Sequence, residues 1–234
     1  MTITTTAGAA SPSSAKLAIF DIEGTTTSIA FVYERLFPYA RAALPDYLAT
    51  HWDDPEVRAA ARIMGADASP EEAVVRAVAL MDGDVKDTGL KVLQGLVWAE
   101  GYADGVIRGH VFSDVPAAFA ALVARGVAVV IYSSGSVAAQ KQIFGYSEAG
   151  DLTTYLSGYF DTTTGPKNDA ASYTTIVGAL EVEPADAIFF TDNLDEARAA
   201  RDAGLQVRVM ARPGNPPLTG DHGFEVWSDF TALG

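Results

Sequence analysis

Hydrophobic residues follow two patterns along this chain, and the two patterns predict different elements. Residues 17–20 are four consecutive apolar residues, which is typical of a strand buried on both faces of a parallel sheet. Further strands are predicted at residues 127–132, 158–161, 187–191 and 206–210. Helices are predicted between them at residues 114–125, 168–180 and 194–203. Strands that alternate with helices in this way predict βαβ units and a parallel sheet.

Residues 28–110 predict helix after helix and no strand, so we expect them to form a separate domain. The first of these helices contains Pro38 and Pro45, which should bend or interrupt it. A later helix begins at a predicted capping box, in which Ser69 and Glu72 satisfy each other's backbone groups. The pattern therefore indicates a helical cap inserted after the first strand.

The predicted fold is an α/β class: a doubly wound, Rossmann-like parallel-sheet core with an inserted helical cap domain. The core comprises residues 17–27 and 111–234, and the cap comprises residues 28–110. Residues 1–16 are mostly Thr, Ala, Ser, Gly and Pro, and we expect a disordered tail. This tail lacks the basic and long apolar regions of a signal peptide, so the expected location is the cytoplasm.

Charge and composition narrow the function classes. The 234 residues contain 16 Lys and Arg against 30 Asp and Glu, a net charge of -14, which argues against nucleic acid as a partner. The chain has no cysteine, which excludes disulfides, thiol catalysis and cysteine-based zinc sites. No apolar run approaches the ~20 residues of a membrane span. We expect a monomer that acts on a small molecule and binds no membrane.

Polar residues with chemical potential come where the predicted strands end. Asp21 and Glu23 follow the first strand, and Asp192 follows a late one. Ligands of open α/β sheets bind beyond the carboxyl ends of the strands, and oxygen ligands from separate strand ends suit Mg²⁺. The turn of Ser133, Ser134 and Gly135 precedes a helix, where hydroxyls and amides can bind phosphate. Lys167 supplies a compact positive charge.

Each feature taken alone has a simpler interpretation. The Ser133 turn and Asp192 could be helix N-caps, the acid pair could be a solvated turn, and Lys167 is one of 16 basic residues. Their joint order, with each feature at or just after a strand end, is what indicates a site that processes phosphate. Zinc is disfavoured, because the only histidines are the widely separated His51, His110 and His222.

The same residues belong to longer stretches whose order is specific. These are Asp21-Ile22-Glu23-Gly24-Thr25-Thr26-Thr27-Ser28-Ile29, residues 36–41, Gln94-Gly95 with Trp98, Gly109-His110-Val111, residues 132–136, Gln140-Lys141, residues 158–167 and Arg212-Pro213-Gly214-Asn215. Together they resemble the haloacid dehalogenase-like phosphatases, and most closely the enolase-phosphatases of methionine salvage. The resemblance covers nearly everything after Lys16. Most phosphatases of the superfamily carry Asp at the position of Glu23, whereas enolase-phosphatases share the Glu.

The resemblance implies a two-step reaction. The substrate would be 2,3-diketo-5-methylthiopentyl 1-phosphate, enolised first and then hydrolysed to the acireductone 1,2-dihydroxy-3-keto-5-methylthiopentene and phosphate. Asp21 would be the nucleophile, and one Mg²⁺ would be held by Asp21, Asp192 and the backbone carbonyl at Glu23. Ser133, Ser134, Gly135 and Lys167 would bind the phosphate, with Lys167 also counted as catalytic.

The base that enolises the substrate is not identified by these motifs. Enolisation needs a base beside the carbon next to a carbonyl. Glu23 is the first candidate and therefore a third predicted catalytic residue; His110 is the second, although a histidine there is more often structural. Two other functions stay open: a monofunctional Mg²⁺-dependent phosphatase of another small phosphate ester, and a non-catalytic phosphate-binding module.

Overall fold

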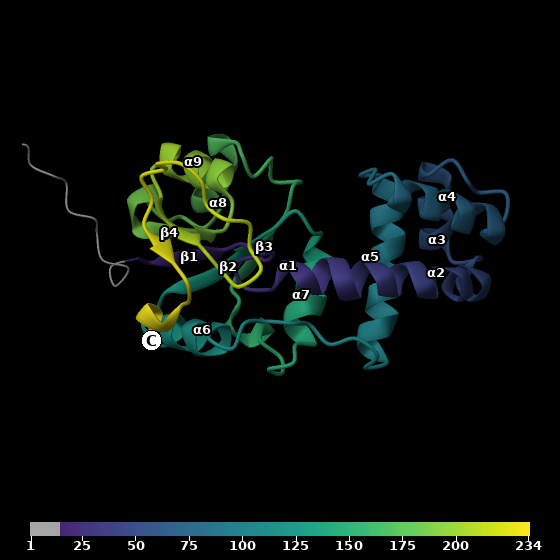
Figure 1. The fold of residues 1–234 in the computed structure, drawn as a ribbon, viewed down its shortest axis with the longest axis horizontal. Coiled ribbons are helices and arrows are strands. Elements are labelled where there is room, and N and C mark those ends of the chain that lie inside the picture. The colour runs from purple at the N-terminus through teal and green to yellow at the C-terminus, as the bar shows by residue number, and fades with distance from the viewer. Residues whose placement is uncertain (1–14) are drawn as a thin grey trace, which may run out of the picture. The chain divides into compact units, whose positions relative to one another are not determined.

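The computed structural model describes residues 15–234, and these contain a six-stranded sheet in which every neighbouring pair of strands is parallel. The strand order is β3-β2-β1-β4-β5-β6, with β1 between β2 and β4 (Figure 1). The predicted α/β fold is confirmed. The strands are β1 (Leu17–Phe20), β2 (Ala128–Tyr132), β3 (Gly158–Phe160), β4 (Ala187–Thr191), β5 (Gln206–Met210) and β6 (Val226–Trp227).

Both faces of the sheet are covered, as a doubly wound fold requires. On one face, Leu17 and Ile19 belong to a buried cluster with residues of α8 (Ala170–Ala179) and α9 (Leu194–Asp202). On the other face, the ring of Phe20 lies 5.1 Å from Phe119 of α6 (Val115–Ala124) and 5.2 Å from Phe230. This two-sided burial explains the uninterrupted apolar sequence of β1, since each such side chain contributes roughly 1.5–3 kcal/mol when fully buried.

The strand order reverses at β1. The carboxyl ends of three neighbouring strands, β2, β1 and β4, therefore lie at the same edge of the sheet. Phe20 is level with Ile131 of β2 and with Phe190 of β4. The residues that follow these strands, Asp21, Ser133 and Asp192, therefore emerge at the same edge of the sheet. A crevice at such a switch point is the usual ligand site of this architecture.

The chain divides into two compact units. One contains residues 15–28, 111–137 and 152–234, with the sheet; the other contains residues 29–110 and 138–151 and is helical. Sequence analysis had placed residues 138–151 in the core, and this assignment changes. Residues 138–151 belong to the helical unit because two backbone hydrogen bonds, both 2.8 Å long, join them to Gly109. They run from Gly109 N to Tyr146 O and from Glu148 N to Gly109 O.

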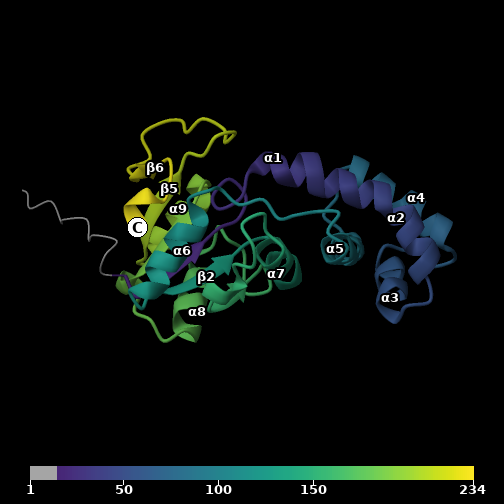
Figure 2. The ribbon, with the colours of Figure 1, turned by 90° about the horizontal axis from the view of Figure 1, so that it is seen from below.

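The first helical path of the second unit runs from α1 (Ile29–Phe31) through a π-helical turn (Val32–Leu36) into α2 (Phe37–His51). Of the two outcomes expected at Pro45, a bend or an interruption, the interruption is absent, since α2 continues through this residue. The irregularity instead precedes Pro38, whose ring would crowd the carbonyl of Glu34 in a regular helix. Figures 1 and 2 show α5 crossing α2 steeply. The remaining helices are α3 (Pro55–Ile63), α4 (Pro70–Asp82), α5 (Thr88–Ala103), α7 (Val137–Gly145) and 3₁₀ turns at Thr153–Tyr155, Pro184–Asp186 and Thr231–Leu233.

Two smaller predictions have mixed outcomes. Half of the predicted capping box forms, because Ser69 Oγ accepts a hydrogen bond from Glu72 N at 3.2 Å, but the Glu72 carboxylate accepts from Ala68 N instead. Most of the predicted tail, residues 1–14, lies outside the described residues. Lys16 continues the pairing of β1 with β4 at the N-terminal end of the strands, since its N–H donates to Asp186 O at 2.8 Å. No helix within residues 15–234 is long and apolar enough to cross a membrane.

Candidate active site

Asp21 is held rigidly at the end of β1. Its N–H donates to Phe190 O at 3.0 Å, which continues the sheet by one residue. Its carbonyl accepts from Thr26 Oγ1 at 3.0 Å, and the N–H groups of Thr25, Thr26 and Thr27 all turn back to Ile22 O. The residue as a whole is 5% exposed. The threonine-rich sequence therefore forms a compact turn that presents one buried carboxylate.

Lys167 is the positive partner of this carboxylate. Its Nζ lies 2.5 Å from Asp21 Oδ1 and 2.8 Å from Glu196 Oε2, and its side chain is 8% exposed. The ammonium group also lies 5.8 Å from the ring centre of Tyr132 and 6.0 Å from that of Phe189. An ammonium has three N–H donors, and two carboxylates account for two of them.

Three hydroxyl groups hold the loop that carries Lys167. Tyr132 donates to Gly165 O at 2.9 Å, Ser172 to Pro166 O at 2.7 Å and Tyr173 to Lys167 O at 2.7 Å. Gly165 has a φ of +148°, and a Cβ there would collide with Ser172 Oγ. Glycine is therefore required, and the loop fixes the lysine backbone on three successive carbonyls.

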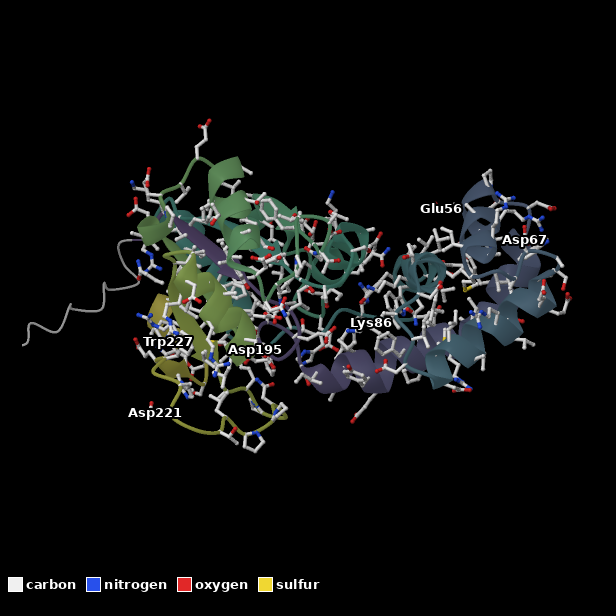
Figure 3. The ribbon with its side chains drawn as sticks, turned by 90° about the horizontal axis from the view of Figure 1, so that it is seen from above. Glu56, Asp67, Lys86, Asp195, Asp221 and Trp227 are labelled. Carbon is white, nitrogen blue, oxygen red and sulfur yellow. The ribbon has the colours of Figure 1, made fainter. Side chains whose placement is uncertain are left out.

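Glu196 is a site residue that sequence analysis missed. It lies in the first turn of α9, three residues after the N-cap Asn193, where a glutamate usually completes a capping box. Its carboxylate instead accepts from Thr191 Oγ1 at 2.8 Å and pairs with Lys167. Asp195, labelled in Figure 3, is the exposed neighbour and pairs with Arg198 at 2.6 Å. The sequence pattern around Glu196, an N-cap residue followed three positions later by a glutamate, predicts a helix cap and gives no sign of a contact with Lys167.

Crowded negative charge dominates the electrostatics of this edge. Burial raises the pKa of Asp21 well above its usual range, and the carboxylates of Glu196 and Asp192 add to the rise while Lys167 opposes it. Burial and then Glu196 raise the pKa of Asp192 to about 6. For Lys167, burial lowers the pKa, but Asp21 and Glu196 outweigh burial and the net shift is upward. A charged Lys167 among three carboxylates leaves an excess of negative charge that favours a cation.

The turn after Asp21 lies directly against Asp192. Gly24 has a φ of +69°, and a Cβ on it would collide with Asp192 Oδ2. Glu23 is partly buried, and its charge is a minor contributor to the raised pKa of Asp192. Within residues 15–234, no group of three or more His, Asp or Glu side chains is arranged to hold a metal ion.

The serine turn after β2 is present, with one serine turned inward. Ser133 is buried and its N–H donates to Phe160 O at 3.1 Å, whereas Ser134 is exposed. Ser133 Oγ accepts from Gly135 N at 3.3 Å. The N-terminal amide of α7, Val137 N, donates to Asp161 Oδ2 at 3.2 Å, so another strand end satisfies it.

The structure thus brings several of the predicted site residues to one edge of the sheet. Asp21 and Lys167 are in direct contact, and the charge of Asp192 acts on Asp21. Ser133 follows the strand next to β1, while Ser134 and Gly135 continue the turn. His110 belongs to the helical unit, where its ring stacks on Phe31 at 6.0 Å and burial lowers its pKa.

Known proteins have sequences similar to that of this chain. Residues 15–204 match the sequence model of the haloacid dehalogenase-like hydrolases. Enolase-phosphatase E1 of Drosophila melanogaster is 46% identical over 94% of this chain and 93% of its own. Enolase-phosphatase E1 of Synechococcus elongatus is 48% identical over 87% of this chain and 92% of its own.

Solved structures agree with the sequence comparisons. The crystal structure of the UTR4 protein from Saccharomyces cerevisiae is similar with a TM-score of 0.81 at 34% identity, covering 93% of this chain and 99% of that one. A dehalogenase solved with an intermediate complex has a TM-score of 0.58 at 18% identity, which supports the fold alone. The chain therefore belongs to the enolase-phosphatase E1 family of haloacid dehalogenase-like hydrolases.

Proposed function

We propose that Asp21, Lys167 and Glu23 carry out the enolase-phosphatase reaction of methionine salvage in this chain. The substrate is 2,3-diketo-5-methylthiopentyl 1-phosphate, which is enolised and then dephosphorylated to the acireductone. The observation that carries the assignment of residues is the buried contact between Asp21 and Lys167, 2.5 Å long, at the switch point of the sheet. A monofunctional phosphatase is not favoured, because the relatives at 46% and 48% identity are enolase-phosphatases.

Asp21 is the nucleophile of the phosphatase step. One carboxylate oxygen attacks phosphorus, the bond from phosphorus to the enol oxygen breaks, and the phosphoryl group moves to Asp21 as an aspartyl-phosphate. Water then attacks this phosphorus, the bond from phosphorus to the Asp21 oxygen breaks, and inorganic phosphate leaves while the Asp21 carboxylate is restored. Attack requires the ionised carboxylate, and the charge of Lys167 opposes the rise in pKa that burial causes. The rigid backbone bonds of Asp21 supply the orientation.

Lys167 and Ser133 bind the phosphate oxygens. Two N–H donors of Lys167 are directed to carboxylates, which leaves the third for an oxygen of the substrate. Ser133 is buried at the end of the adjacent strand, where its hydroxyl can donate to a second oxygen. Donors fixed before the reaction stabilise charge that develops on the transferring phosphoryl group.

A divalent cation fits the chemistry of this edge. Hydrolases of this family generally depend on Mg²⁺. The available donors are oxygens: the carboxylates of Asp21 and Asp192, the backbone carbonyl of Glu23, and an unpartnered buried Oδ1 of Asn215 beside Gly24. One Mg²⁺ is proposed to be held by Asp21, Asp192 and the Glu23 carbonyl. When bound, it neutralises charge between the nucleophile and the phosphate.

Glu23 is the proposed base of the enolase step. If its backbone carbonyl serves as a ligand, its carboxylate can take the proton from the carbon next to the substrate carbonyl. His110 is the second candidate, since its lowered pKa keeps the imidazole neutral near pH 7. We assign the helical unit, residues 29–110 with 138–151, the role of a cap domain.

The experiment that tests this function follows both products at once. The purified chain is mixed with the diketone phosphate and Mg²⁺ while enediol absorbance and phosphate release are recorded together. Asp21→Asn keeps the volume of the side chain and removes the nucleophile, so phosphate release should fall by about 1,000-fold or more. Enediol absorbance should still grow. Phosphate release above a tenth of the wild-type rate would remove Asp21 from the nucleophile role.

A further inference from the structure

The loop that joins β5 to β6 carries a signature stretch that the mechanism above leaves without a role. The loop is drawn in yellow in Figure 2, and the stretch begins at Arg212 and ends at Asn215. Both polar side chains reach the turn that follows β1. Arg212 Nε donates to Thr25 O at 3.0 Å, and Asn215 Nδ2 donates to Gly24 O at 2.8 Å.

The two polar groups of the Asn215 amide are in different environments. Nδ2 also donates to Met210 O at 3.2 Å, so both of its N–H groups face carbonyl oxygens. The reverse orientation would set Oδ1 against two acceptors, which fixes the orientation of the amide. Oδ1 is buried, and among the residues described no group donates a hydrogen bond to it. A buried acceptor of this kind calls for a donor outside the polypeptide.

The surroundings of this oxygen indicate the donor. A Cβ built on Gly24 would lie 3.0 Å from Asn215 Oδ1 and would collide with Asp192 Oδ2, so both oxygens border the same small space. Asp192 is a proposed Mg²⁺ ligand, and Mg²⁺ usually keeps several of its waters. We propose that Asn215 is a positioning residue of the metal site. Its Nδ2 holds the Gly24 turn, and its Oδ1 accepts a hydrogen bond from a water bound to the cation.

Arg212 serves as a comparison, because its bonds describe a structural brace. Nη1 donates to Asp114 Oδ2 at 2.8 Å, and the guanidinium lies 4.5 Å and 4.4 Å from the ring centres of Phe112 and Phe230. Through these contacts Arg212 joins the turn that follows β1 to the aromatic side chains of Phe112 and Phe230. Asn215, by contrast, combines a bond to the turn with an oxygen beside Asp192.

The test is direct metal binding by the full chain without substrate. Binding of Mn²⁺ is followed by electron paramagnetic resonance, and Mg²⁺ is added as a competitor. Asn215→Ala should weaken both Kd values by about 10- to 100-fold, the usual effect of losing an outer partner of a metal site. Asn215→Leu has similar volume and no polar group, should behave alike, and replaces the alanine variant if that one does not fold. Asn215→Asp keeps an acceptor, so its Kd should stay within about threefold of wild type or tighten, while Tm falls.

Gln206 is a matched control at the opposite end of β5. Its Nε2 donates to Ala185 O at 2.9 Å, and its Oε1 is likewise buried without a donor among the described residues. Gln206→Ala should lower Tm and leave both Kd values unchanged. An unchanged Kd in a folded Asn215→Ala or Asn215→Leu overturns the proposal, and so does equal weakening in Gln206→Ala or in Asn215→Asp.

This inference rests on the proposed metal site, and the wild-type protein separates the two. If the wild type binds neither cation, the metal site of the proposed function is wrong. If the wild type binds both cations and the deletion variants bind them equally well, only the role of Asn215 is wrong.

Discussion

Lys167 donates to Asp21 across 2.5 Å, and the side chains of both residues are only 8% exposed. A buried ion pair is costly to form, because two charges leave water. Removing one partner strongly destabilises the folded protein, because the other charge is left buried without compensation. Here the lysine has a second carboxylate, Glu196, at 2.8 Å, so its position is fixed from two sides. The arrangement prepares one donor for a phosphate oxygen before substrate arrives.

Glu196→Gln should therefore lower kcat/KM for phosphate release by about 10- to 100-fold with little change in fold. The amide keeps the volume and can still accept from Thr191, but it no longer holds Lys167 by charge. The matched control is Asp195→Asn, one residue earlier on the same helix turn, whose carboxylate pairs with the exposed Arg198 (Figure 3). The measurement is steady-state kinetics of both variants, and equal losses would contradict a specific role for Glu196.

Tyr173→Phe should loosen the loop that carries Lys167. The hydroxyl donates to Lys167 O at 2.7 Å, and removing it leaves a buried carbonyl, which costs about 1–3 kcal/mol of unfolding free energy. Tyr132→Phe removes the bond to Gly165 O in the same loop. Because both bonds hold one segment, the losses of activity in the double variant should not be additive. Urea unfolding and kcat/KM are measured for all three variants, and additive losses of activity would argue against a shared loop.

The pKa of Asp192 predicts how stability depends on pH. Burial and then Glu196 raise it from 3.8 to about 6. Between these values the folded protein binds a proton that the unfolded chain has lost, so this residue makes the metal-free protein less stable as pH rises from 4 to 6. Asp192→Asn should stabilise the metal-free protein at about pH 7.5, by at most ~3 kcal/mol, and much less at about pH 4.5.

Urea unfolding with a chelator at both pH values measures this difference. With Mg²⁺ at high pH, the wild type should become more stable than Asp192→Asn, because the cation stabilises the ionised carboxylate of the wild type and not the amide. A stabilisation of equal size at both pH values would show that the substitution acts through packing and not through ionisation.

The sequence predicted those parts of the fold that depend on local burial. The bounds of β1, β4 and β5 agree with the structure because each strand is a run of mainly apolar residues. β6 was missed, since it contains only Val226 and Trp227 and Val226 is 43% exposed. The order of the strands within the sheet could not be predicted, because hydrophobic periodicity indicates where strands occur and not which strands are neighbours.

Sequence analysis missed Glu196 and misassigned residues 138–151 for one physical reason: both depend on contacts between residues that are distant in sequence. Glu196 has the local signature of a capping residue, and only the loop of Lys167, 29 positions earlier, turns it into a partner of the site. Residues 138–151 follow a strand, as core helices do. Their backbone bonds to Gly109 assign them to the helical unit, and a Cβ on Gly109 would collide with Ile143 O.

Glu23→Asp should separate the two reactions. The substitution keeps the charge and the backbone carbonyl, and it withdraws the carboxylate by one methylene, roughly 1.5 Å. A base must meet one particular carbon-bound proton, and a misplacement of about 1 Å can cost ~100-fold. We therefore expect enolisation of the diketone phosphate to slow at least about tenfold, while hydrolysis of an aryl phosphate, which needs no enolisation, is mostly retained.

Both rates are measured on one preparation at saturating Mg²⁺, as growth of enediol absorbance and as release of the aryl alcohol. Glu23→Gln provides the second comparison, because it keeps the length of the side chain and removes its basicity. It should lose enolisation more completely than Glu23→Asp and should again spare the aryl phosphate. If both rates fall together in Glu23→Asp, the residue serves the metal site or its geometry. If enolisation is untouched in both variants, Glu23 is not the base, and His110 is the next residue to substitute.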